Sequence, residues 1–186
     1  TSLESLRGLE GACATLYFSV LDDMIPHMAV FIYPYVSWFP YIVVCAYLAI
    51  KNLDDRQFKK AVLVLTTGMN IFLFISFVWP TGLNLRESIV YDLHTLSGNL
   101  LKFVQTVDTP KSVFPSMHVY VTLVLQYTLE MQKKLVPSWG IWVGRVLAVL
   151  IVLSTMFTKQ HSVLDVSAAI VMFAVLAVVV EKIVKK

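Results

Sequence analysis

The chain has 186 residues, of which 58% are hydrophobic and 15% charged, and its formal net charge is +3. Ordinary soluble domains are only about 45–50% apolar, so these few charges could not cover a core of this size in water. The composition excludes a typical soluble domain and predicts a single membrane-embedded domain over residues 1–186, with the membrane and not nucleic acid as its partner.

The N-terminal part of the chain, residues 1–33, is the least regular. Its apolar stretch 3–21 carries Glu4, Arg7 and Glu10. We therefore expect either an amphipathic helix lying in the membrane interface or a partial first span. No basic region followed by a cleavage site is visible, so no signal peptide is expected.

Five later stretches predict membrane-spanning helices within residues 34–181. A span needs about 20 mostly apolar residues. Four stretches qualify on length and composition: 34–50, 61–79, 137–157 and 161–180. A fifth, 115–131, is the third in chain order and is more polar but long enough. They lack the alternation of β-barrel strands. The predicted fold class is all-α, a polytopic transmembrane helix bundle with five clear spans and a possible N-terminal sixth.

The basic residues between the spans predict the orientation. If the spans alternate, the segments 51–60, 132–136 and the C-terminal tail share one side with nine Lys and Arg residues, against four on the other. The positive-inside rule places the C-terminus in the cytoplasm and the long segment 80–114 outside. Arg145 falls inside a predicted span; we expect it to reach toward the cytoplasmic edge, with a buried ion pair or a functional role as alternatives.

The predicted topology gathers polar residues on the outward face. They come from the two stretches "FPSMH" and "STMFTKQHSVLD", and from the outward loop and turn: Ser116, His118, His161, Asp165, Arg86 and Lys159. Two helices would begin there, with free N–H groups and positive dipole ends. Such helix ends with Arg and Lys nearby suit an anion, and phosphate is the natural one.

The spacing of His161 and Asp165 is four residues, so both lie on one face of a helix. A carboxylate that accepts from one imidazole nitrogen fixes the tautomer and leaves the other nitrogen free to attack. His118, from the other helix, could protonate a leaving oxygen. The set suits phosphoryl transfer through a phosphohistidine.

Each residue taken alone also has a plainer interpretation. His118 could be a capping or core residue, Ser116 an N-cap, Arg86 a solvated loop residue or headgroup contact, and Lys159 an interfacial side chain. Asp108 and His94 could shape headgroup choice or be ordinary loop residues. A zinc site of His118, His161, Asp165 and Asp108 is conceivable but lacks a compact ligand motif. Cys13 and Cys45 lie in apolar surroundings and predict buried thiols, not a disulfide or a zinc site.

These residues resemble the type-2 phosphatidic acid phosphatase superfamily, which has three motifs: Lys…Arg-Pro, Pro-Ser-Gly-His, and Ser-Arg…His…Asp. "FPSMH" is similar to the second and "STMFTKQHSVLD" to the third, with Ser154, His161 and Asp165 in register. "WPTGLNLRE" is similar to the end of the first, and "LDDMIP" and "PYVSW" to the early region of bacterial members. The resemblance covers roughly residues 22–180.

The chain departs from that pattern at several positions. Met117 replaces the motif glycine, Thr155 the arginine, Glu87 the proline after Arg86, and Trp79 the upstream lysine. The resemblance implies that His161 attacks phosphorus, Asp165 orients it, and His118 protonates the leaving group and then activates water. It implies that phosphate is held by Arg86, Ser116, the Met117 amide and Lys159, with help from Ser154. No metal or cofactor is expected, because cationic side chains and helix ends supply the positive field.

The resemblance thus implies a metal-independent lipid phosphatase in the cytoplasmic membrane of a bacterium, with its site facing outward. Candidate substrates are undecaprenyl pyrophosphate, phosphatidylglycerol phosphate and phosphatidic acid. A phosphotransferase of the same fold, or a lipid-phosphate binder without catalysis, are the alternatives. The sequence leaves the oligomeric state open.

Overall fold

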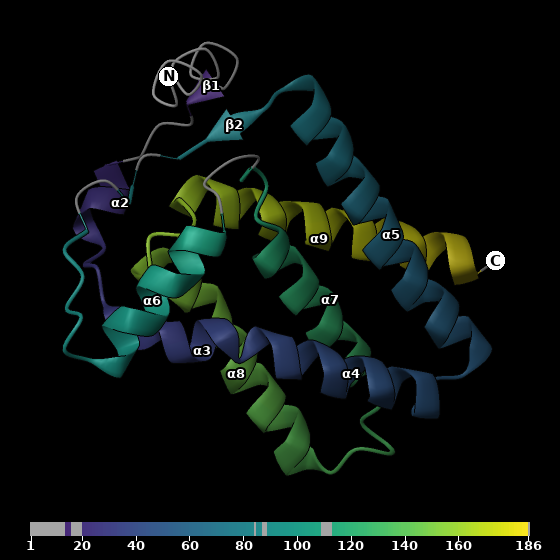
Figure 1. Ribbon diagram of the computed structural model, residues 1–186. Coiled ribbons are helices and arrows are strands. Elements are labelled where there is room, and N and C mark those ends of the chain that lie inside the picture. The colour runs from purple at the N-terminus through teal and green to yellow at the C-terminus, as the bar shows by residue number, and fades with distance from the viewer. Residues whose placement is uncertain (1–13, 16–19, 84, 87–88, 109–112, 186) are drawn as a thin grey trace.

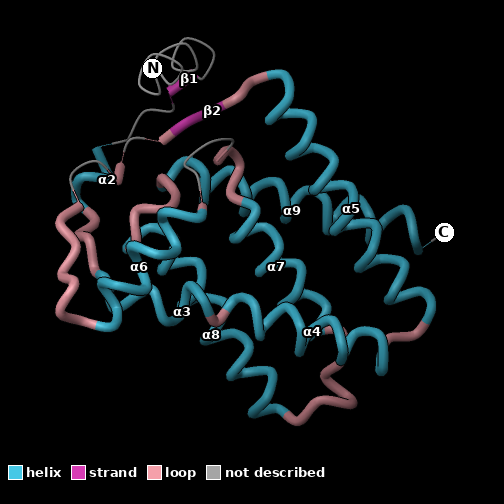
Figure 2. Tube along the Cα trace, viewed as in Figure 1, coloured by secondary structure: helices cyan, strands magenta, loops and turns pink. Residues whose placement is uncertain are grey.

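The structure is a computed structural model that describes residues 14–15, 20–83, 85–86, 89–108 and 113–185. Helices dominate it (Figures 1 and 2). In chain order the elements are β1 (Ala14–Thr15), α2 (Val20–Met24), η1 (Ala29–Phe31), α3 (Ile32–Val36), α4 (Trp38–Asn52), α5 (Asp55–Val78), β2 (Thr81–Gly82), α6 (Leu96–Val107), α7 (Met117–Glu130), α8 (Ser138–Phe157) and α9 (Val163–Lys185). The short strands β1 and β2 pair in parallel.

Four helical segments are long and apolar enough to cross a membrane: Ala29–Asn52, Asp55–Val78, Ser138–Phe157 and Val163–Val184. The first joins η1, α3 and α4 into one span. These segments match four of the predicted spans, and the prediction of an all-α membrane helix bundle is confirmed. The proposed N-terminal helix over 3–21 lies almost wholly outside the described residues.

The fifth predicted span, 115–131, differs from the others. It forms α7, a helix of 14 residues, which is about 21 Å long at 1.5 Å per residue and short of a hydrocarbon core of about 30 Å. Figure 1 shows α7 in the middle of the bundle, and it packs against α4, α5, α8 and α9. A helix enclosed by protein does not need a lipid-compatible surface, which explains its polar composition.

Glycines allow neighbours to approach α7 closely. A Cβ placed on Gly68 of α5 would lie 2.0 Å from the ring of Tyr120, whose hydroxyl donates to the Val64 carbonyl at 2.5 Å. A Cβ on Gly144 of α8 would lie 2.5 Å from Leu129. Small residues at such contacts replace a hydrophobic driving force with close van der Waals packing between helices.

The segment between β2 and α7 contains a helix that the sequence analysis left as loop. Helix α6 begins after Thr95, whose hydroxyl accepts from the Gly98 amide at 3.1 Å. Its buried Leu101 packs with Ile32 and Tyr35 of the first span. Figure 2 shows α6 interrupting the loop segments on this side of the bundle. Helix α6 has only 12 residues and mixes buried with exposed apolar side chains, so it is too short to be predicted as a membrane span.

Arg145 forms an ion pair instead of only reaching for the membrane edge. Its Nε and Nη2 lie 2.6 and 2.9 Å from the two carboxylate oxygens of Glu130, and Lys133 lies 2.7 Å from the same carboxylate. An ion pair therefore joins α7 and α8, but it is partly exposed and not the buried pair given as an alternative, with side-chain exposures of 35% for Arg145 and 25% for Glu130. Cys45 is a buried free thiol, as expected, and Cys13 lies outside the described residues.

Candidate active site

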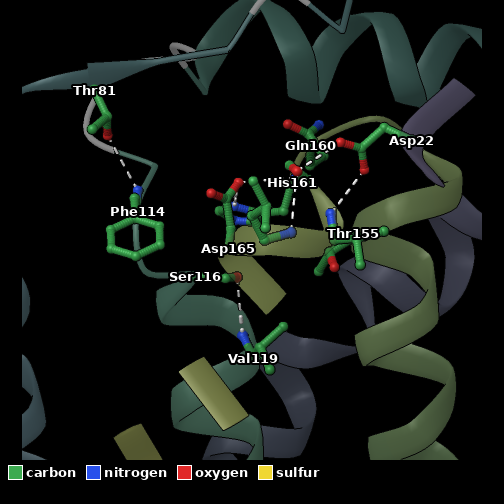
Figure 3. A network of polar contacts seen from close by, with 12 residues as sticks. Asp22, Thr81, Phe114, Ser116, Val119, Thr155, Gln160, His161 and Asp165 are labelled. Atoms are coloured by element: carbon green, nitrogen blue, oxygen red, sulfur yellow. Dashed lines mark hydrogen bonds and ion pairs between the residues drawn. The ribbon is translucent and has the colours of Figure 1, made fainter. Parts of the chain in front are cut away.

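The beginnings of α7 and α9 are joined directly. The Ser116 side chain caps α7 by accepting from the Val119 amide at 3.4 Å, and the Ser116 amide donates to the Asp165 carbonyl at 3.1 Å. Ser116 is completely buried. Figure 3 shows Ser116 and Asp165 close together below His161. The two helix N-termini that topology predicted on one face are therefore neighbours in space.

His161 and Asp165 form the predicted pair. The His161 Nδ1 lies 3.5 Å from Asp165 Oδ2, and the Asp165 side chain is wholly buried while that of His161 is 10% exposed. Asp165 Oδ2 also accepts from the Ser162 amide at 2.9 Å. The start of α9 thus fixes the carboxylate, and the carboxylate faces one ring nitrogen of His161. The opposite nitrogen, Nε2, is left on the far side of the ring.

His118 faces His161 from the first turn of α7. The ring centroids are 6.0 Å apart and the rings are tilted by 55°. Tyr35 and Trp38 both contact the His118 ring, with centroid distances of 4.8 and 4.3 Å. The His118 imidazole therefore has two aromatic neighbours from the first span, Tyr35 stacked at 28° and Trp38 tilted at 39°. The sequence contains them in "PYVSW", but only the fold shows that they contact the histidine.

Arg86 reaches the same region from the loop after β2. Its Nη1 donates to the Asp108 carbonyl at 2.5 Å, and its Nη2 lies 3.4 Å from the Asp108 carboxylate. Nη2 also donates to the side-chain oxygen of Gln160. Burial lowers the pKa of Arg86, while the neighbouring Asp108 carboxylate raises it. Asp108, which could have been an ordinary loop residue, therefore positions a cation.

Lys159 occupies a turn between α8 and α9 with a positive φ of 56°. Its ammonium donates to the carbonyls of Asp22 and Ile25, both at 2.6 Å. Lys159 thus ties the N-terminal part of the described chain to the turn before His161. Ser154 is buried and its hydroxyl donates to the Ile151 carbonyl at 2.6 Å. Their roles as phosphate ligands stay predictions.

Asp22 is a site component that the sequence analysis did not find. Its carboxylate accepts from the Ser162 hydroxyl at 2.7 Å and from the Val163 amide at 2.8 Å. Figure 3 shows these contacts beside His161. Asp22 therefore caps α9 from 140 residues away along the chain. A carboxylate at a helix N-terminus satisfies orphan N–H groups and complements the dipole, but no local pattern links it to α9.

Met117 is the first residue of α7, where backbone N–H groups have no partner within the helix. Its side chain packs against the core around Val119 and Val124, so the residue that replaces the motif glycine is accommodated by apolar contacts. Glu87 lies outside the described residues. Within the described ranges, no group of three or more His, Cys, Asp or Glu residues could hold a metal ion, so the zinc interpretation finds no ligand cluster there.

The geometry agrees with a comparison against protein families. A family model described as the PAP2 superfamily matches residues 19–179. No curated protein and no solved structure gives a significant match. The matched range includes both histidines, Asp165, Arg86 and Asp22, and it covers most of the 186 residues. The chain therefore belongs to the PAP2 superfamily.

Proposed function

We propose that the protein is a metal-independent membrane phosphatase that hydrolyses a lipid phosphate or pyrophosphate through a phosphohistidine. The observation that carries this proposal is the pair of facing imidazoles, 6.0 Å apart between centroids, with Asp165 against the Nδ1 of His161. Family membership supports phosphatase-type activity in general. The membrane-spanning helices support a substrate that resides in the bilayer.

The proposed reaction has two steps. In the first, Nε2 of His161 attacks phosphorus, the bond from phosphorus to the leaving oxygen breaks, and protonated His118 gives its proton to that oxygen. In the second, His118 takes a proton from water, the hydroxide attacks phosphohistidine, and inorganic phosphate leaves as His161 is restored. Asp165 holds the imidazole orientation and stabilises its positive charge in both steps.

The phosphate group needs donors that are in place before the reaction, because preorganised donors stabilise developing charge without reorganisation. We assign this role to Arg86, to the Ser116 hydroxyl and to the backbone amide of Met117. Ser154 and Lys159 now donate to carbonyls. The Ser154 hydroxyl would have to leave its acceptor to bind phosphate, and two of the three N–H donors of Lys159 are already used, so their proposed part is secondary.

The lipid would enter with its headgroup at the end of the bundle where α7 and α9 begin. The charge distribution between spans supports an outward-facing site with the C-terminus in the cytoplasm. Undecaprenyl pyrophosphate, phosphatidylglycerol phosphate and phosphatidic acid all present a phosphate that this site would accept. The remaining chains of the lipid would stay in the bilayer.

Phosphate release in detergent tests the proposal. Purified wild type, His161→Ala and His94→Ala are compared on undecaprenyl pyrophosphate and phosphatidic acid with EDTA present. His94 is exposed in the loop before α6, so its variant controls for loss of a histidine as such. We expect EDTA-resistant release by wild type and His94→Ala and none by His161→Ala.

Three results would contradict the proposal. Release that EDTA abolishes would indicate a metal-dependent site. Lipid consumption that transfers the phosphoryl group to an added alcohol without releasing phosphate would indicate a phosphotransferase. Binding of either lipid without any turnover would indicate a binder. Acid-labile phosphate retained on wild type but not on His161→Ala would identify the intermediate directly.

A further inference from the structure

Gln160 is a buried side chain whose amide is only half used. It is 1% exposed and directly precedes His161. Its Oε1 accepts from Arg86 Nη2, whereas its Nε2 has no hydrogen-bond partner among the described residues. A buried amide donor without a partner destabilises the folded state, because the hydrogen bonds it loses to water are not replaced. Such a group in a native fold calls for an explanation, and a ligand that accepts hydrogen bonds is one.

The partner of Gln160 has the same property. Arg86 donates through Nη1 and Nη2, but its buried Nε is without a partner in the part of the chain that the structure describes. The hydrogen bond between Arg86 and Gln160 therefore joins two side chains that each have one more N–H donor without a partner among the described residues. The two donors come from segments that are far apart in the sequence: Arg86 lies in the loop after β2, and Gln160 lies in the turn before α9.

Two other polar side chains near this position already donate to backbone carbonyls. Lys159 donates to two backbone carbonyls, and the Thr155 hydroxyl donates to the Val152 carbonyl at 2.7 Å. Figure 3 shows Gln160 beside His161 and Asp22, at the turn that carries the proposed nucleophile. Among the described residues of this turn, Gln160 combines almost complete burial with an amide donor that has no hydrogen-bond partner.

We propose that Gln160 is a phosphate ligand: its Nε2 donates to a non-bridging phosphate oxygen, and its Oε1 holds Arg86 beside the same group. The assignment rests on the proposed phosphatase function and adds a binding residue to it. A neutral amide suits this place because it can accept from a cation and donate to an anion at once. A carboxylate could accept from Arg86 but would repel phosphate.

The competing explanation is that Gln160 acts only through Arg86. A double-mutant cycle separates the two, because a residue that works only through Arg86 has no further effect once Arg86 is removed. The variants are Gln160→Met, Arg86→Ala and the double variant. Gln132→Met is the matched control, since Gln132 is equally buried and bonds Asn52 and Thr128 at the opposite end of α7.

The readouts are kcat and KM for lipid phosphate and the inhibition constant of inorganic phosphate, together with the rise in Tm that inorganic phosphate produces. We expect Gln160→Met to weaken phosphate inhibition by about tenfold to a hundredfold, and to weaken it again by about tenfold in the Arg86→Ala background. Gln132→Met should lower Tm without changing phosphate inhibition.

Equal phosphate inhibition in Arg86→Ala and the double variant would overturn the proposal and leave Gln160 as a support for Arg86. Unchanged inhibition in Gln160→Met would overturn both roles. If wild type releases no phosphate from lipids but phosphate still raises its Tm and not that of Gln160→Met, the phosphatase function fails while the Gln160 assignment holds.

Discussion

The backbone amide of Ser116 donates to the backbone carbonyl of Asp165 at 3.1 Å, which joins the first turns of α7 and α9 by a main-chain contact. Apart from proline at position 116, no substitution removes the donor or the acceptor of this hydrogen bond. The distance between His118 and His161 therefore depends on how α7 and α9 pack against each other. The orientation of the two imidazole rings depends on neighbouring side chains, which can be substituted one at a time. The predictions below use that separation.

Asp165→Asn should keep the fold and abolish most of the activity. The amide oxygen can still accept from the Ser162 amide, which Asp165 Oδ2 now does at 2.9 Å. The charge that stabilises a cationic His161 is lost, and by analogy with other carboxylate-oriented histidines kcat should fall about 10³- to 10⁴-fold. Phosphate release and Tm measured on the same preparation check this. An active Asn variant would show that the carboxylate is structural.

The loss of rate in a His118 variant should depend on the leaving group of the substrate. If His118 protonates the departing oxygen, the rate of the first step with an alkyl phosphate should fall about 10²- to 10⁴-fold in His118→Gln. With p-nitrophenyl phosphate, whose leaving group departs without a proton, the first step should be much less affected. Burst kinetics with the two substrates measure that step. The same loss with both substrates would contradict a general-acid role.

Trp38→Leu should slow the reaction without much effect on KM. The indole contacts the His118 ring with 4.3 Å between centroids, and removing it leaves Tyr35 as the other aromatic neighbour described for His118. We expect kcat to fall about tenfold, since one misplaced catalytic group is costly. Phe39→Leu is the matched control, because Phe39 is the next residue and is 58% exposed. Equal effects of the two substitutions would indicate general loosening of α4.

Asp22→Ala should lower both stability and activity. Removing a helix cap is destabilising by about 1–2 kcal/mol, and the loss falls on the turn that carries His161. Asp54→Ala removes a comparable cap, that of α5, whose carboxylate accepts from the Gln57 amide at 2.8 Å. Both variants should lower Tm, but only Asp22→Ala should reduce kcat. Full activity in Asp22→Ala would show that His161 is positioned without this contact.

Gly68→Ala should destabilise the bundle. The new Cβ would lie 2.0 Å from the Tyr120 ring, so α5 and α7 would have to separate, at about 1–3 kcal/mol. Gly140→Ala is the comparison, because its Cβ would lie 3.2 Å from a methyl group of Val136 and helix propensity favours alanine by about 1 kcal/mol. Thermal unfolding in detergent should separate the two. A neutral Gly68→Ala would show that the helices part without strain.

The sequence predicts the helix bundle and the pair of His161 and Asp165 because both depend on local patterns. These are apolar runs of spanning length and the spacing of four residues between His161 and Asp165. Asp22, Gln160 and the aromatic pair around His118 depend on contacts between segments far apart in the chain, and no local spacing encodes them. Helix α6 was missed because its length and mixed composition resemble a loop. The span over α7 was overestimated in length because hydropathy does not report whether a helix faces lipid or protein.

The enclosure of α7 has a consequence for how the protein enters the membrane. A short helix with Thr122, Gln126 and Glu130 along it has little free energy of transfer into lipid on its own, since charged and polar residues oppose insertion. Its enclosure is completed by α8 and α9, which follow it in the chain and pack against it as α4 and α5 do. Because His161 directly precedes α9, the pairing of His118 with His161 requires the last span to be in place.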